Sequence, residues 1–197
     1  MHEALPLSRI HAAILGFLQG RKDVVLFGAQ AVNAYVTEPR MTQDVDLLSN
    51  RAKEFAEELR EFLSKEFNIA VRIREVVEGK GFRIYQLRSE GNRHLVDLRA
   101  IAFLPGSELI EDIQVLSPVE LIASKVISYH SRKGKPKAGT DYRDLGMLLL
   151  RFADLKREVT ALLETKQVGT AILGTWAEIE KLDFQFDGDA EDEDLMF

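Results

Sequence analysis

Two aspartates separated by one residue carry the strongest chemical signal in the chain. They are Asp44 and Asp46, in a stretch where Val45 and Leu47 alternate with the acids. This alternation over Gln43–Leu48 predicts a β-strand that turns both carboxylates to the same face. Aspartate is a poor strand former, so the pair carries a local cost that a functional role would explain.

Parallel carboxylates repel each other unless a cation lies between them, and Mg²⁺ prefers such hard oxygen ligands. Nucleotidyl transfer commonly uses two such ions, and a third carboxylate is expected from a neighbouring strand. Asp97 is the candidate, because it lies in the apolar strand pattern His94–Ala100. The alternative is that these are surface acids, with Asp97 in an ordinary ion pair. The predicted site binds Mg²⁺ (or Mn²⁺) through Asp44, Asp46 and Asp97.

A glycine follows the short apolar run Val24–Phe27, which is typical of a buried strand. Gly28 would let the backbone come close to a ligand, and the N–H groups that open the next helix would form an anion site. We expect the β- and γ-phosphates of a nucleoside triphosphate (NTP) to bind there.

These residues resemble the nucleotidyltransferase superfamily, in which an apolar strand and a Gly-Gly or Gly-Ser turn precede an Asp-x-Asp pair and a separate third acid. The similarity is greatest to the AbiEii/AbiGii toxin-like branch, which includes the MenT toxins and has an Arg-x-Thr-x-Asp-x-Asp-Leu string. Here that string runs through Arg40 and Thr42 to Leu47. The branch also has a helical lysine and a later Asp-x-x-Asp-Leu helix, matched by Lys125 and Asp141–Leu145.

The resemblance implies a metal-dependent enzyme that moves a nucleoside monophosphate from an NTP to an acceptor hydroxyl. The acceptor would be RNA such as tRNA, a protein or a small molecule, and a toxin–antitoxin or abortive-infection role would add a cognate antitoxin as partner. The implied catalytic residues are Asp44, Asp46, Asp97 and Lys125. The implied nucleotide contacts are Gly28, Ala29, Gln30, Arg40, Thr42, Lys125, Asp141, Arg143 and Asp144.

One departure from the family pattern supports a second interpretation. Ala29 stands where relatives have a second glycine or a hydroxyl residue, so Gln30 or backbone amides would have to bind the phosphate instead. The alternative function is therefore a catalytically weak nucleotide-binding or protein-interaction module of the same fold. The histidines have no ligand spacing and none is expected to bind metal; they are His2, His11, His94 and His130.

The elements that must position these residues indicate an α+β fold: a nucleotidyltransferase core with a mixed sheet and flanking helices, plus a C-terminal helical lobe. Helical spacing predicts helices at 7–18, 29–35, 51–67, 119–129, 142–150, 155–163 and 170–181. Strand patterns cover 24–27, 43–48, 69–77, 82–87 and 94–100. We expect the core at 1–110, the helical lobe at 111–181 and an acidic tail at 182–197.

Composition sets the remaining limits. The 197-residue chain has no cysteine and a net charge of -6, and seven of its acids lie in the tail, so the rest is near neutral. The tail is expected to be disordered, either as a solubilising segment or as a strap over a basic site. The basic stretch Ser131–Lys137 is either a solvated loop or a clamp on triphosphate or RNA. Without an apolar run of about 18 residues or a leader pattern, we expect a cytoplasmic protein with no membrane span.

Overall fold

The computed structural model describes residues 5–185, which form two compact units. The first unit ends at Ser117 and the second begins at Pro118. The division falls later than the predicted 110/111 because two short strands after Pro105 complete the sheet of the first unit. The predicted acidic tail lies outside the described residues from 186 onward.

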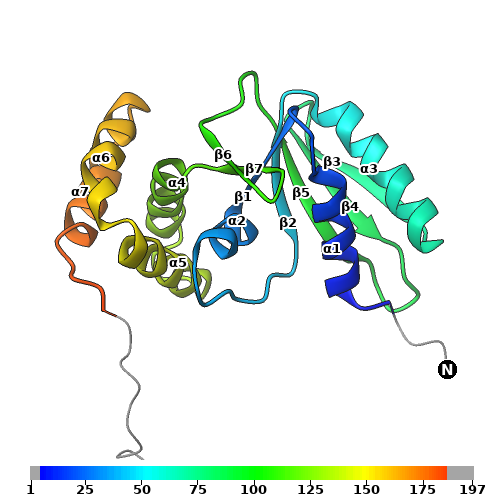
Figure 1. Ribbon diagram of the computed structural model, residues 1–197, viewed down its shortest axis with the longest axis horizontal. Coiled ribbons are helices and arrows are strands. Elements are labelled where there is room, and N and C mark those ends of the chain that lie inside the picture. The colour runs from blue at the N-terminus through cyan, green and yellow to red at the C-terminus, as the bar shows by residue number, and fades with distance from the viewer. Residues whose placement is uncertain (1–4, 186–197) are drawn as a thin grey trace, which may run out of the picture. The chain divides into compact units, whose positions relative to one another are not determined.

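A seven-stranded sheet forms the centre of the first unit (Figure 1). Its strands are β1 (Val24–Phe27), β2 (Val45–Ser49), β3 (Val71–Val77), β4 (Gly81–Gln86), β5 (Arg93–Ala100), β6 (Ser107–Ile110) and β7 (Ile113–Leu116). The strand order is β3-β4-β5-β2-β1-β7-β6. The β2–β5 and β1–β7 pairs are parallel and the other pairs antiparallel, which confirms the predicted mixed sheet.

One face of this sheet is apolar and packs on helices. The helices of the unit are α1 (Leu7–Leu18), α2 (Gly28–Tyr35) and α3 (Ala52–Phe67). α3 contacts β2 to β5 and buries Phe55, Leu59 and Leu63, while Phe17 of α1 stacks on Phe62 of α3 at 4.8 Å between ring centroids. α1 and α3 lie on the same side of the sheet in Figure 1. Strand alternation therefore leaves the polar residues of β2, β4 and β5 on the opposite face.

The β6–β7 hairpin is absent from the sequence prediction because its turn lacks the usual residues. A two-residue turn, Glu111–Asp112, joins the strands, and both residues have positive φ, 48° and 64°. Asparagine and glycine usually occupy such positions. The C-terminal end of α1 holds the turn: the Gly20 N–H donates to the Asp112 carbonyl at 2.8 Å.

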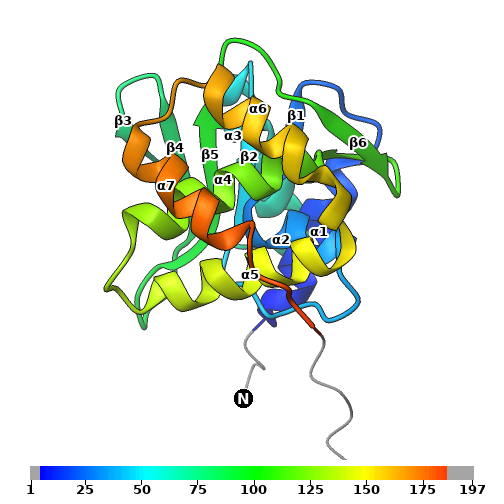
Figure 2. The same ribbon diagram turned by 90° about the vertical axis from the view of Figure 1, so that its left-hand side faces the viewer.

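The second unit is helical throughout its described part, as predicted (Figure 2). Its helices are α4 (Pro118–Ser131), α5 (Lys137–Arg151), α6 (Lys156–Thr165) and α7 (Thr170–Ile179), with a 3₁₀ turn at Ala153–Leu155. α4 contacts the other three helices. The basic stretch Ser131–Lys137 forms the connection between α4 and α5. Among residues 5–185, no helix has the length and apolar character needed to cross a bilayer.

An ion-pair network lies in the core of this unit. Lys125 on α4 donates to Asp144 at 2.7 Å and to Asp141 at 3.4 Å, and both acids lie on α5. Arg132 donates to Asp141 at 2.7 Å. Asp144 is fully buried, and Lys125 and Asp141 are 6% and 2% exposed. The network therefore joins α4 to α5 through the buried charges of Lys125, Asp141 and Asp144, with Arg132 at its partly exposed end.

Replacing Lys125 by Met should destabilise the second unit by about 3–5 kcal/mol, because it removes the ammonium that lies 2.7 Å from the buried Asp144 carboxylate. The only tryptophan, Trp176 on α7, is buried and reports unfolding by fluorescence in a urea titration. The control is Lys135→Met, which removes an exposed lysine from the same unit and should change stability by less than about 0.5 kcal/mol. Equal stability of the two variants would contradict a structural role for the network.

Candidate active site

The polar face of the sheet brings the predicted aspartates together through strand register. Asp46 on β2 pairs directly with Asp97 on the parallel strand β5, and on its other side with Phe27 of β1. Directly opposed residues share a face, so the two carboxylates lie on neighbouring strands about 4.8 Å apart. Asp44 lies just before β2, two residues from Asp46, and so faces the same way.

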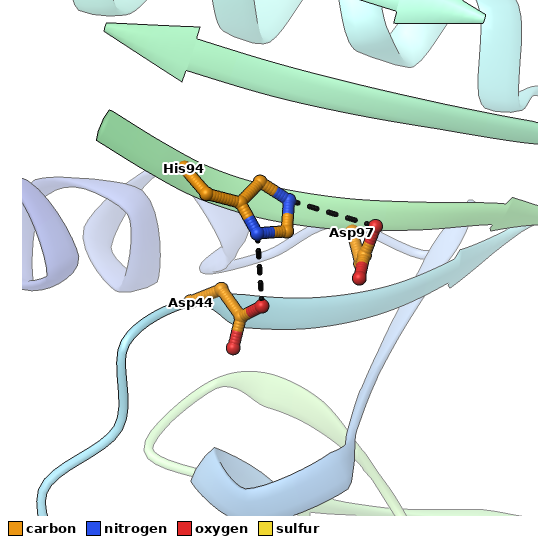
Figure 3. A group of neighbouring side chains, drawn as sticks. All are labelled: Asp44, His94 and Asp97. Carbon is orange, nitrogen blue, oxygen red and sulfur yellow. Dashed lines mark ion pairs between the residues drawn. The ribbon is translucent and has the colours of Figure 1, made fainter. Parts of the chain in front are cut away.

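A histidine lies between two of the three acids. His94 Nδ1 is 3.1 Å from Asp44 Oδ2, and His94 Nε2 is 3.5 Å from Asp97 Oδ1 (Figure 3). One potential ligand atom from each residue lies within 4.8 Å of the others. Arg83 on β4 also donates to Asp97 Oδ1, at 2.7 Å. The side chains of Asp44, His94 and Asp97 are 26% to 31% exposed, so a ligand can reach them.

Hydrogen bonds within this cluster shift the pKa values of its members toward their charged forms. The hydrogen bond to Asp44, followed by that to Asp97, outweighs burial and raises the pKa of His94 to about 10. Burial alone would raise the pKa of Asp97, but hydrogen bonds from His94 and Arg83 lower it to about 2. At neutral pH the cluster therefore holds an imidazolium between carboxylates, in the position where a bound cation would also neutralise them.

His94 was not expected at the site, and a β-bulge explains why. In a regular strand, residues three apart such as His94 and Asp97 face opposite sides of the sheet. Here the β4–β5 register shifts: Ile84 pairs with Val96 but Tyr85 pairs with His94, so Leu95 is an extra residue. The bulge accommodates this extra residue, so His94 lies on the same face as Asp97 although the two are three positions apart. No local sequence signal announces the bulge, although the adjacent apolar residues Leu95 and Val96, both buried, interrupt the alternation.

Gly28 lies between β1 and α2 and is subject to a steric constraint, while its predicted contact with phosphate stays a prediction. Its φ is +68°, and α2 begins at this residue directly after β1. A Cβ atom at Gly28 would overlap the carboxylate of Asp46 and lie 2.6 Å from its Cγ. Asp46 therefore packs against the first residue of α2, where only glycine fits.

The loop between α2 and β2 is fixed to α2 by side-chain amides. Asn33 accepts from the Arg40 N–H at 3.0 Å and donates to the Arg40 carbonyl at 2.8 Å. Gln30 donates to the Thr42 hydroxyl at 2.8 Å, so its amide holds the loop in this structure. A cavity of about 320 Å³ adjoins these residues, with Gln30, Arg40 and Thr42 in its wall. Buried His11 of α1 also lines it.

Apart from Ala29, the remaining predicted residues lie in the second unit. Lys125, Asp141 and Asp144 come together in the buried network described above, and Arg143 Nη1 lies 4.0 Å from Asp144. In the described state the Lys125 ammonium is engaged by carboxylates. Its predicted contact with nucleotide stays a prediction, as do those of Asp141, Arg143 and Asp144. Ala29 is the second residue of α2, beside Gly28.

The chain matches the family described as nucleotidyl transferase AbiEii toxin, type IV toxin–antitoxin system, over residues 12–194. It is a member of the AbiEii nucleotidyltransferase toxin family. No curated protein matches the sequence. The family model thus confirms the resemblance that the Asp-x-Asp string and Gly28 indicate.

Solved structures resemble this AbiEii family chain at low sequence identity, and JHP933 supports the shared fold. JHP933 from Helicobacter pylori is similar with a TM-score of 0.53 and 13% identity, covering 88% of this chain and 87% of its own. A putative nucleotidyltransferase from H. pylori has a TM-score of 0.48 and 13% identity, over 91% of this chain and 92% of its own. ANT(2")-Ia in complex with adenylyl-2"-tobramycin has a TM-score of 0.46 and 16% identity, over 88% of this chain and 95% of its own.

Replacing Gly28 by Ala should destabilise the first unit by more than the same change at Gly79. Gly79 has a similar φ of +63° but no atom within 4 Å of an added Cβ, so Gly79→Ala carries only the backbone cost, about 1–2 kcal/mol. Gly28→Ala adds the clash with Asp46. Urea titration followed by circular dichroism measures both, and Gly28→Ala/Asp46→Gly should recover part of the loss. Equal costs at the two glycines would show that Asp46 does not pack as described.

The stability contribution of His94 should depend on pH. Its folded-state pKa of about 10 exceeds the ordinary value of 6.5, so its contribution is complete below 6.5 and is lost as pH rises toward 10. The stability contribution of Asp97 is present above pH 3.8 and is lost as pH falls toward 2. The difference in unfolding free energy between the AbiEii family protein and its His94→Gln variant should therefore shrink from about pH 6 to about pH 9.5. A constant difference across that range would contradict the imidazolium bridge.

Proposed function

We propose that this AbiEii family member is a metal-dependent nucleotidyltransferase that moves a nucleoside monophosphate from an NTP to an acceptor hydroxyl, acting as a toxin with a cognate antitoxin. One observation carries the proposal. Asp46 lies beside Asp97 on the parallel strand and packs against Gly28 at the start of α2, while His94 joins Asp44 to Asp97. Carboxylates beside an anion-binding helix N-terminus suit phosphoryl chemistry.

The start of α2 supplies a seat for the triphosphate. Backbone N–H groups at a helix N-terminus attract anions, and Gly28 allows a phosphate to come close to the backbone. Because the Asp46 carboxylate packs against the same residue, a phosphate there would meet a like charge. A divalent cation between them would remove that repulsion. The N-terminus of α2 and the Asp46 carboxylate therefore support binding of an NTP together with its metal ion.

The donor set fits Mg²⁺ or Mn²⁺. Asp44 and Asp97 bring carboxylate oxygens within 4.8 Å of each other. Asp46, which is in register with Asp97 and packs against Gly28, would supply the third carboxylate. Carboxylates suit these hard cations. His94 is a cation itself at neutral pH, so it is a charge partner of the acids and not a ligand in the described state. When bound, the metal would polarise the phosphate oxygens and neutralise charge that develops on them.

The chain's own residues would hold the reacting groups in line. The acceptor oxygen forms a bond to the α-phosphorus, the bond to the bridging oxygen breaks, pyrophosphate leaves and the hydroxyl proton passes to solvent. Asp44, Asp46 and Asp97 would hold the metal. Against the effect of burial, hydrogen bonds from His94 and Arg83 lower the pKa of Asp97 to about 2. This makes Asp97 a weaker proton acceptor than an ordinary aspartate, so we assign it the role of ligand and not that of general base.

A second candidate function is nucleotide binding without turnover. Ala29 offers no hydroxyl to a phosphate, and the Gln30 amide that could replace it is engaged with Thr42. Isothermal titration calorimetry with each NTP and Mg²⁺, followed by incubation with α-labelled NTPs and total RNA, protein or small hydroxyl compounds, separates the two functions. A binding module would give heat with an NTP but label no acceptor.

Asp46→Asn should abolish detectable label transfer while leaving the fold intact, because it removes the anionic oxygen beside the triphosphate seat. Transfer by the unchanged protein should also stop when EDTA is added. The control is Glu66→Gln, which removes an exposed acid from α3 and should retain transfer. Circular dichroism checks the fold of both variants. Unchanged transfer by Asp46→Asn would refute the assignment of this site.

A further inference from the structure

Arg99 is an exposed cation on the face of the sheet that carries the aspartates. It lies on β5 two residues after Asp97, where the pairing of β5 with β2 and β4 is regular, so the two side chains share a face. Its partner in register on β2 is Leu48 and its partner on β4 is Gly81, and neither side chain carries a charge. Arg99 therefore brings to this face a positive charge that its neighbours on the adjoining strands do not neutralise.

The guanidinium of Arg99 stacks on an aromatic ring. Its Cζ lies 4.9 Å from the centroid of the Phe27 ring. Arg83 and His94, by contrast, pair with Asp97 at 2.7 Å and 3.5 Å. Within residues 5–185, Arg99 forms no ion pair. A guanidinium that stacks on a ring keeps its charge, and its N–H donors, which lie in its plane, stay available to an anion.

The ring also places this guanidinium next to the N-terminus of α2. Phe27 is the last residue of β1, pairs in register with Asp46 and directly precedes Gly28. Because Arg99 starts from β5, its side chain crosses β2 to reach the ring on β1. The guanidinium therefore lies over the strand that ends at the proposed triphosphate position, on the face of the aspartates.

We propose that Arg99 is a catalytic residue that donates hydrogen bonds to the β- and γ-phosphates of the NTP and stabilises pyrophosphate as it leaves. The acceptor oxygen forms its bond to the α-phosphorus while the bond from that phosphorus to the bridging oxygen breaks. The electron pair of the broken bond stays on pyrophosphate, where the guanidinium neutralises part of the charge. The hydroxyl proton passes to solvent. This inference rests on the proposed function, because it assigns a further residue to that reaction.

The chemistry of the phosphates explains why an arginine suits this position. A triphosphate at the start of α2 would meet the Asp46 carboxylate, and a second cation at the end of β1 lowers that repulsion. The planar guanidinium can donate two parallel hydrogen bonds to phosphate oxygens. An ion pair with an aspartate would cancel the charge of Arg99, whereas the Phe27 ring holds the group in place and leaves the charge for the ligand.

The test measures binding of inorganic pyrophosphate in the presence of Mg²⁺ to the full chain by isothermal titration calorimetry, which needs neither acceptor nor transfer. Arg99→Gln should weaken binding about 10- to 100-fold, because it removes a charge-assisted contact. Arg99→Lys should recover only part of the loss, since an ammonium keeps the charge but lacks the planar pair of donors. Phe27→Leu should weaken binding less than Arg99→Gln, because it releases the guanidinium without removing it. Circular dichroism establishes that the variants are folded.

The matched control removes the same charge from the same face of the sheet. Arg74 is an exposed arginine on β3, in register with Arg83 and four strands from β1, or roughly 19 Å. That distance exceeds the Debye length of about 8 Å at physiological salt, so Arg74→Gln should leave pyrophosphate affinity near that of the unchanged protein. Equal losses in Arg74→Gln and Arg99→Gln would overturn the inference, because the effect would then follow net charge alone.

Transfer of label separates a catalytic role of Arg99 from simple binding. Arg99→Gln should lower kcat as well as kcat/KM for the NTP, because the charge that the guanidinium meets grows as pyrophosphate departs. A higher KM with an unchanged kcat would overturn the catalytic role, since Arg99 would then bind the ground state and the transition state equally.

The outcomes also separate this inference from the proposed function. Pyrophosphate binding that Arg99→Gln leaves unchanged, or no binding by the unchanged protein, overturns the role of Arg99 but not nucleotidyl transfer, which the labelled NTPs test independently. Pyrophosphate binding that depends on Arg99, with no transfer of label to any acceptor, supports the phosphate contact and refutes the proposed reaction.

Discussion

The parallel pairing of β2 with β5 is the constraint on which the site depends. It places Asp46 directly beside Asp97, so two like charges lie on neighbouring strands in any side-chain rotamer. Such an arrangement is stable only where positive charge is supplied. Within the described chain that charge comes from Arg83 and His94, which contact Asp97 from β4 and β5. The same need for positive charge is what makes the site suited to a metal-bound triphosphate.

Much of the fold could be predicted because its signals are local. The bounds predicted for α1 and β1 agree with the structure, since apolar spacing and the glycine after Phe27 mark them. The alternation of the acids with Val45 and Leu47 correctly placed Asp46 away from the buried face of β2. The tight turn at Gly28 could also be predicted, because a glycine directly between a buried strand and a helix allows a backbone conformation that other residues rarely adopt. The C-terminal unit followed from helical spacing alone.

What escaped prediction depends on contacts between distant residues. The β6–β7 hairpin is held by hydrogen bonds from Gly20 and Gln19 to its turn, so Glu111 and Asp112 adopt a backbone that their own side chains do not favour. The partner of Asp97 is Arg83, fourteen residues away on β4, and not an arginine next to it in the chain. His94 could be placed only by knowing the register of β4 against β5. The register is a property of the paired strands, so it cannot be read from the sequence of one strand alone.

The bulge at Leu95 lets β5 present His94 and Asp97 on one face although they are three positions apart. If β5 kept Leu95 but alternated regularly, His94 would lie on the face opposite to Asp97. Deleting Leu95 would instead leave His94 two positions before Asp97, so both side chains would share a face of a regular strand. The irregular backbone at this point therefore compensates for one additional residue, and a deletion at that position would keep the imidazole beside the carboxylates.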